Sequence, residues 1–235
     1  MATERRHHPQ PTPEVASDLH RMGLSSDVLR AAAQAGHDEA VSCTANDVLT
    51  RPGYVRWATP FRYLGDHYAR DGWTRERPKG FELLVNPSRT IAIGIAPGDH
   101  WTGIERDPRT GQPRMPRTRI DRGPVTGQAI IGNRGQARFD ASDHPAFAEG
   151  LLPGLTIWFL LHHWNDVPAD GIDEIRLELS VPVEFCPISP ASERGYITRF
   201  EPRLILPAIH LVKLIDTNED RDDGDDAIDI EISRR

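Results

Sequence analysis

Apolar residues recur at helical spacing in the first third of the chain and predict three helices. The first begins at Glu14 and ends before Gly23. The second is capped by Ser25 or Ser26 and is predicted to end at Gly36, because glycine is typical of helix ends.

Residues 59–71 form the third predicted helix. Thr59 suits the N-cap, and Pro60 suits the first helical position, where the missing N–H has no helical partner to lose. With the hairpin that follows, the three helices allow a winged-helix hypothesis, in which this helix reads DNA while Arg62 and Arg70 face phosphate. A DNA-binding regulator is therefore one alternative function.

Beyond residue 80 the pattern changes to strands. Residues 81–85 and 90–96 are apolar and flank an Asn-Pro-Ser-Arg turn, so they predict a hairpin whose second strand is buried, unlike an exposed wing. Residues 155–161 are continuously apolar, and a buried strand and a short core helix both stay open. The clearest alternation covers residues 175–185, where Pro182 indicates an edge or a bulge. Further strands are predicted at residues 196–200, 203–206, 209–215 and 227–233.

Early helices and late strands predict an α+β fold, in which N-terminal helices precede a mainly antiparallel β-sheet. The sequence lacks the repeated βα units of a doubly wound nucleotide-binding fold. A chain of 235 residues suits one large domain, which we predict over residues 14–235. Residues 1–13 are polar and broken by proline, and we expect them to be a disordered tail.

Composition narrows the class of protein. The 19 glycines and 20 prolines predict many turns and argue against a helical bundle. No apolar run approaches the roughly 20 residues of a membrane helix, and no secretory signal is recognised, so we expect a cytoplasmic protein that does not bind membranes. Reduced thiols are favoured over a single disulfide between Cys43 and Cys186, and Cys186 is expected to be a buried structural thiol.

Charge is distributed unevenly along the chain. The net charge is -7, but nine acids and one arginine lie between Asp216 and Glu231, which predicts an acidic loop at about 216–226 and leaves the rest near neutral. Residues 104–128 instead hold six arginines against three acids, with four prolines that break regular structure. We predict a long surface loop there that contacts a polyanion, either nucleic acid or an acidic protein. The candidate binding residues are Arg106, Arg109, Arg114, Arg117, Arg119 and Arg122.

Motifs of nucleotide binding or nucleophilic catalysis are missing from the sequence. There is no Walker A motif, no GxSxG and no SxxK, and the spaced glycines of Gly127–Gly135 lack the lysine of a phosphate loop. The carboxylates around Glu178 have no lysine in ExK spacing, and the acidic loop does not fit the EF-hand rule. An enzyme is therefore not the leading hypothesis, and no cofactor is predicted.

A divalent metal at the ends of two strands is the enzymatic alternative. Asp99 and His100 follow one apolar stretch, and His162 and His163 follow another. Imidazole and carboxylate bind divalent metals, so Asp99, His100 and His162 would be the ligands and catalytic residues of a metal-dependent phosphoester hydrolase or nuclease. Adjacent histidines of a strand point to opposite faces. A strand-end histidine bonded to the backbone is therefore the simpler interpretation.

Four short stretches of the sequence stand out together. They are Gly72-Trp73, TIAIGIAPGDHWTG at 90–103, RLELSVP at 176–182 and RLILP at 203–207. In these stretches the chain resembles uncharacterised bacterial proteins associated with plasmids and integrative elements. The resemblance implies an accessory role in a mobile-element setting and transfers no residue role. The leading hypothesis is a non-enzymatic accessory or regulatory protein that contacts a protein complex, and nucleic acid within it through the arginine-rich loop.

Overall fold

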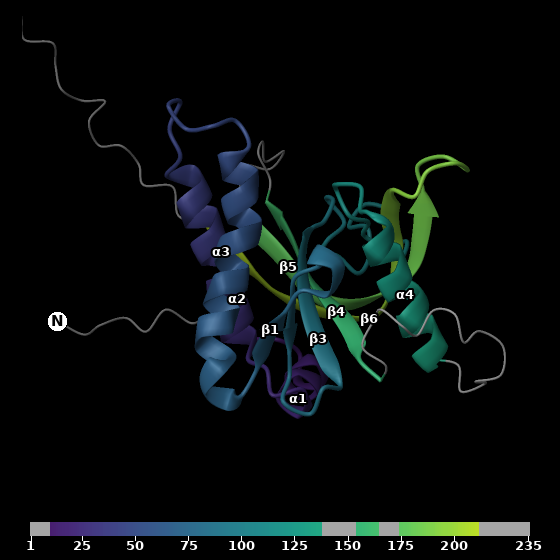
Figure 1. Ribbon diagram of the computed structural model, residues 1–235. Coiled ribbons are helices and arrows are strands. Elements are labelled where there is room, and N and C mark those ends of the chain that lie inside the picture. The colour runs from purple at the N-terminus through teal and green to yellow at the C-terminus, as the bar shows by residue number, and fades with distance from the viewer. Residues whose placement is uncertain (1–9, 138–153, 165–173, 212–235) are drawn as a thin grey trace, which may run out of the picture.

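A computed structural model describes residues 10–137, 154–164 and 174–211 and confirms the α+β fold (Figure 1). The strands form one six-stranded sheet in the order β1-β2-β3-β4-β5-β6, in which β3 and β4 are parallel and the other neighbours antiparallel. The helices are α1 (Pro13–Arg21), α2 (Ser26–Val41), α3 (Arg51–Tyr68) and α4 (Pro124–Ala137), with 3-10 turns η1 (Ala69–Asp71) and η2 (Pro78–Gly80). The strands are β1 (Thr74–Glu76), β2 (Leu83–Val85), β3 (Ile91–Pro97), β4 (Thr156–Trp164), β5 (Glu174–Pro187) and β6 (Gly195–His210).

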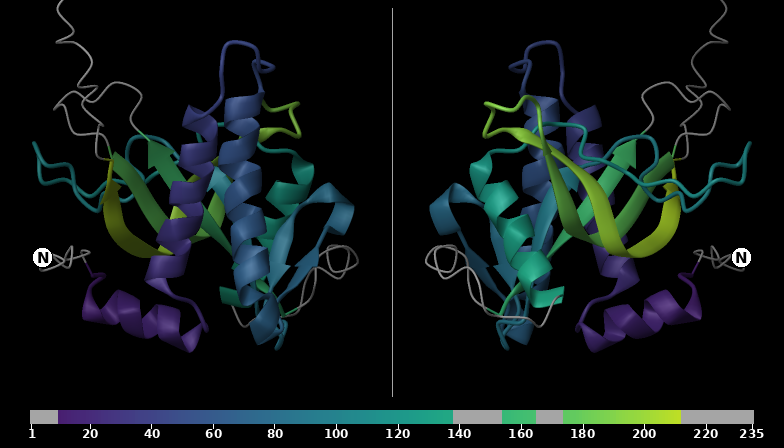
Figure 2. Two further views of the ribbon diagram at one scale, coloured as in Figure 1. Left: turned by 90° about the vertical axis from the view of Figure 1, so that its left-hand side faces the viewer. Right: turned by 90° about the vertical axis from the view of Figure 1, so that its right-hand side faces the viewer.

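The sheet is buried on both faces and forms a separate core on each. Helices α1, α2 and α3 cover one face, and α4 covers the other (Figure 2). Leu160 and Leu161 are neighbours in β4, and each is fully buried in a different core. A strand with two buried faces has a continuous apolar sequence. For this reason, periodicity did not distinguish a strand from a helix at residues 155–161.

The helix boundaries predicted at Gly36 and Thr59 are wrong for one shared reason. α2 continues through Gly36, and α3 begins at Arg51, so that Thr59 and Pro60 lie in its interior. A Cβ atom at Gly36 would come within 2.7 Å of the Pro60 ring and 3.3 Å of the Arg56 carbonyl oxygen. Glycine is therefore required for the close packing of the two helices, at the place where proline interrupts the hydrogen-bond ladder of α3.

In the second half of the sheet, β6 joins the strands predicted at 196–200 and 203–206 and contains the first two residues of the one predicted at 209–215, of which residues 212–215 lie outside the described ranges. β6 passes through Pro202 and Pro207 without a break. Among the described residues it is the last strand of the sheet, and both prolines fall at shifts of its register with β5, where proline is tolerated. Pro182 lies in β5, between β4 and β6, at a shift of register, so of the two predicted options the bulge is the right one.

Cys186 is exposed, which corrects the prediction of a buried thiol. It lies in the last part of β5, where exposed positions replace the buried ones of the strand's centre. Cys43 and Cys186 are both free. The acidic loop at 216–226, the strand predicted at 227–233 and residues 1–9 lie outside the described residues.

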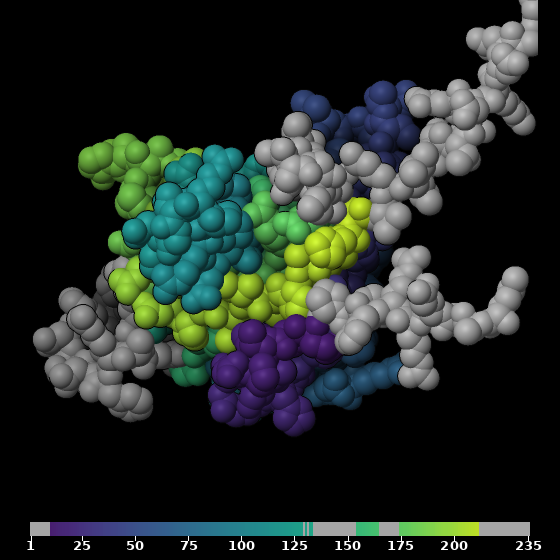
Figure 3. All heavy atoms as spheres, turned by 180° about the vertical axis from the view of Figure 1, so that it is seen from behind, coloured from purple at the N-terminus to yellow at the C-terminus, as the bar shows by residue number. Residues whose placement is uncertain are grey.

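Residues 98–123, which we call the crossover loop, run from β3 to α4. The loop lies over β5 and β6 (Figure 3), and it ends earlier than predicted because α4 begins at Pro124. Gly127–Gly135 therefore belongs to a helix and not to a glycine loop. Two isolated bridges lie within the loop, between Gly98 and Thr118 and between Arg106 and Pro113, and a third joins Arg122 of the loop to Gly195 of β6.

Candidate functional site

The parallel pair β3 and β4 brings polar residues to one edge of the sheet. Pro97 at the end of β3 lies opposite His162 near the end of β4. The crossover loop leaves this edge and returns to it, because the Arg119 amide donates to the Pro97 carbonyl at 2.9 Å and the Asp99 amide to the Arg117 carbonyl at 3.0 Å. The topology therefore places the last arginines of the loop beside the C-terminal end of β4.

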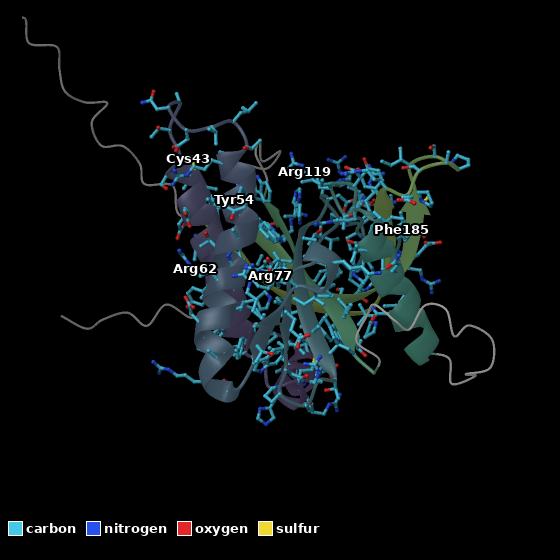
Figure 4. The ribbon with its side chains drawn as sticks, in the orientation of Figure 1. Cys43, Tyr54, Arg62, Arg77, Arg119 and Phe185 are labelled. Atoms are coloured by element: carbon cyan, nitrogen blue, oxygen red, sulfur yellow. The ribbon has the colours of Figure 1, made fainter. Side chains whose placement is uncertain are left out.

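Basic side chains from three elements gather around His162 and Trp164. These two residues project from the same side of β4, with ring centroids 5.4 Å apart. The guanidinium of Arg56, from α3, lies 4.2 Å from the centroid of the Trp164 ring, and that of Arg119 lies 5.4 Å from it. Figure 4 shows Arg119 at this edge, away from Arg62 on the outer side of the helices. We call the following set the basic cluster: His37, Arg56, Arg119, Arg122 and His162, together with Trp164.

Burial and nearby basic groups keep the His162 ring uncharged, so that it can donate or accept a hydrogen bond. Only 4% of its surface is exposed, and burial is the main reason that its pKa falls from 6.5 to about 3. The charges that contribute most to this shift are all basic: Arg56, then Arg122, then two histidines. Burial also lowers the pKa of Arg122 to about 10, against the opposing charge of Asp121. At neutral pH, His162 is therefore uncharged and Arg122 is charged.

Several buried nitrogen atoms of the basic cluster lack a hydrogen-bond partner among the described residues. They are Nε2 of His162, Nε1 of Trp164, and Nε and Nη2 of Arg122. A buried polar group left unsatisfied costs about 1–3 kcal/mol, and more when it is charged. Fixed positive charge together with open N–H groups is an arrangement that stabilises a bound anion.

The remaining arginines of the crossover loop divide into structural and exposed ones. Arg114 is structural, because Nη2 pairs with Asp107 at 2.5 Å and the guanidinium lies 4.4 Å from the Trp101 ring centroid. Arg106, Arg109 and Arg117 are exposed. Of the six predicted binding residues, the structure therefore brings Arg119 and Arg122 into the basic cluster and leaves Arg106, Arg109 and Arg117 at the surface.

Sequence analysis missed a second buried polar group, the pair of Glu178 and Arg203. Glu178 is fully buried in β5, and its Oε2 lies 2.5 Å from Nη2 of Arg203 in β6. Its two oxygens also accept from the Gly103 amide at 2.9 Å and from the Ser180 hydroxyl at 2.7 Å. Sequence analysis considered Glu178 only among the carboxylates without a lysine in ExK spacing, and no sequence signal identified its partner 25 residues away.

The predicted metal ligands Asp99, His100 and His162 do not form one group. Asp99 accepts from the Trp101 amide at 3.1 Å, and the His100 ring packs against the Trp101 ring. Nδ1 of His163 lies 3.3 Å from the Gly98 carbonyl oxygen, which is the backbone contact expected of a strand-end histidine. Within the described ranges, no three His, Cys, Asp or Glu residues are arranged to hold a metal ion.

Comparison with protein-family models, with curated proteins and with solved structures found no match to this chain. Among the described helices, none is both long enough and apolar enough to cross a membrane. The assignment of a function therefore depends on the chemistry of the site.

Proposed function

We propose that this chain is a non-enzymatic accessory binding protein that contacts a complex containing nucleic acid, in a bacterial mobile-element setting. The observation that supports it most is the basic cluster, in which the buried His162 and the half-buried Arg122 hold nitrogen atoms that have no hydrogen-bond partner among the described residues. The exposed arginines of the same loop, Arg106, Arg109 and Arg117, add positive charge to its surface.

The charge pattern fits contact with phosphates better than contact with bases. Arginine binds phosphate oxygens through two parallel N–H groups, and such contacts fix the position of a protein on nucleic acid without reading its sequence. Aromatic rings for base stacking are few at this edge, and Trp164 already has Arg56 and Arg119 at its faces. We therefore expect binding that depends weakly on sequence and strongly on salt.

The test compares two matched pairs of exposed arginines by fluorescence anisotropy with labelled single- and double-stranded oligonucleotides. One variant replaces Arg106 and Arg109 of the crossover loop by glutamine. The control replaces Arg62 and Arg70, which are exposed on α3 and η1. We expect the loop variant alone to lose affinity, with the slope of log K against log salt falling by about one per lost contact.

The same experiment separates the alternatives. Loss of binding in the control variant, with the loop variant unaffected, would favour the DNA-binding regulator that reads through residues 59–71. A binder also keeps its affinity when Asp99 and His100 are replaced by alanine, whereas a metal-dependent hydrolase loses turnover. If neither arginine pair affects binding, the proposed contact surface is wrong.

A further inference from the structure

We infer that the basic cluster is a binding site for one phosphate group, either free phosphate or the terminal phosphate of a nucleic-acid strand. The terminal phosphate as ligand rests on the proposed function, whereas a free phosphate ion does not. The inference starts from three side chains of two elements, His162 and Trp164 of β4 and Arg122 of the crossover loop.

The hydrogen-bond donors of the basic cluster suit an anion that has several acceptor oxygens. Nε and Nη2 of Arg122 and Nε1 of Trp164 are obligatory donors, and neutral His162 donates from one ring nitrogen. None of these four atoms has a hydrogen-bond partner among the described residues. A tetrahedral phosphate carries four oxygens, which lets it accept from donors that approach from β4 and from the loop together, whereas a carboxylate offers only two oxygens in one plane.

Burial distinguishes a terminal phosphate from an internal one. His162 is 4% exposed, and the nitrogen atoms named above are buried, so the donors sit beneath the protein surface. An internal phosphodiester of a nucleic-acid strand carries a nucleoside on each side, so it does not project from the strand. A terminal phosphate projects from the strand and carries up to two negative charges, which suits Arg122 with Arg56 and Arg119 nearby.

The first measurement is the thermal melting midpoint of the full chain in sodium phosphate and in sodium chloride of equal ionic strength. Phosphate raises the midpoint if it binds the folded chain. Arg122→Met and His162→Phe are expected to weaken phosphate binding at least ten-fold, because each removes a charged or buried hydrogen bond. His163→Gln is the matched control for the histidine, since His163 lies on the opposite face of β4.

Arg70→Met is the control for the arginine. Arg70 is exposed and lies fourteen residues beyond Arg56, which is roughly 20 Å along a helix. Both controls are expected to keep the phosphate effect, and circular dichroism in chloride shows that each variant is folded before phosphate is added.

The second measurement gives the source of the phosphate, with oligonucleotides of one sequence that end in a 5′-phosphate, a 3′-phosphate or only hydroxyl groups. A terminal phosphate is expected to tighten binding at least ten-fold in the native chain and in Arg70→Met, and not in Arg122→Met. If phosphate raises the midpoint but the three oligonucleotides bind equally, the site takes the free ion.

Two outcomes overturn the inference. In one, neither inorganic nor terminal phosphate has an effect; in the other, Arg122→Met and His162→Phe respond to phosphate as the native chain does. Neither outcome decides the proposed function, because the Arg106 and Arg109 variant tests that surface separately.

Discussion

The crossover loop joins two buried polar regions that differ in one respect. Beneath the middle of the loop, Glu178 and Arg203 have partners at both carboxylate oxygens and at all three guanidinium nitrogens. Near its end, His162 and two guanidinium nitrogens of Arg122 are buried beside further positive charge, and nitrogen atoms of both residues have no hydrogen-bond partner among the described residues. Both regions contain a largely buried guanidinium, but only that of Arg203 contacts a carboxylate, whereas Asp121, whose charge acts on Arg122, pairs with Arg194.

This difference separates a structural polar group from one that is available to a ligand. A buried ion pair with all its hydrogen bonds made fixes the loop on the sheet, and breaking it leaves an uncompensated charge. A buried cation without a carboxylate lowers the stability of the fold, and a bound anion removes that penalty. The two regions should therefore respond to mutation with opposite signs.

The largest expected effect is at Glu178. Glu178→Gln keeps the shape of the side chain but leaves the Arg203 charge buried, so the free energy of unfolding should fall by about 3–5 kcal/mol. Urea denaturation measures this, with Glu184→Gln as the control because Glu184 is exposed on the same strand. The double variant Glu178→Leu, Arg203→Leu should lose less than the single variant. A single variant within about 1 kcal/mol of the native chain would contradict a structural pair.

The second effect is a pH dependence that His162 imposes. Its pKa is about 3 in the folded chain and about 6.5 when unfolded, so between these values only the unfolded chain binds the proton. Stability therefore falls as pH is lowered from 6.5, by up to about 1.4 kcal/mol per pH unit, or about 2 kcal/mol by pH 5. Arg114 holds the pKa of Asp107 at about 2, so that carboxylate loses its contribution only below about pH 4.

Denaturation at pH 6.5 and pH 5 tests this dependence. His162→Phe should reduce the slope of the stability profile between the two values, leaving the part that comes from His163, whose pKa burial also lowers, whereas Glu184→Gln should leave the slope as it is in the native chain. An unchanged slope in His162→Phe would mean that another group titrates in this range.

The sequence predicted the fold class well because its signals are local. The alternation in residues 175–185, the Asn-Pro-Ser-Arg turn and the order of helices and strands each need only neighbouring residues. The failures at Gly36 and Pro60 have a different origin, since each was interpreted as a helix boundary when the two pack against each other across α2 and α3. A contact between distant residues overrode two correct local preferences.

The sequence predicted only part of the candidate site, because the site too depends on contacts between distant residues. The arginine-rich loop was visible from composition, and its last members do reach the basic cluster. The sequence did not show that Arg119 and Arg122 would meet Arg56 of α3 and His162 of β4, because that depends on the parallel pairing of β3 with β4. Nor did it show that Arg114 is neutralised by Asp107 within the same loop.

Arg122→Met is expected to raise the stability of the fold, the opposite of the effect expected for Glu178→Gln. Arg122→Met replaces a buried guanidinium, with two open nitrogens, by an apolar side chain of similar length. In phosphate-free chloride buffer the free energy of unfolding should rise by about 1–2 kcal/mol, because an unsatisfied buried donor is removed. Urea denaturation at pH 7 measures the change, with Arg70→Met as the control that should stay near the native value. A loss of stability in Arg122→Met would show that Arg122 supports the fold as Arg203 does.

The smallest expected effect is at Arg109, which lies in the same loop as Arg114 but is exposed. Arg109→Gln should change the free energy of unfolding by less than about 0.5 kcal/mol, as surface substitutions usually do. Its effect should instead appear in the slope of log K against log salt for oligonucleotide binding, which falls by about one when one phosphate contact is lost. Arg114→Gln should show the reverse, a measurable loss of stability with little change in slope, because Arg114 is paired with Asp107 and packed on Trp101. If Arg109 and Arg114 behave alike in both measurements, the division of the loop into neutralised and available arginines does not hold.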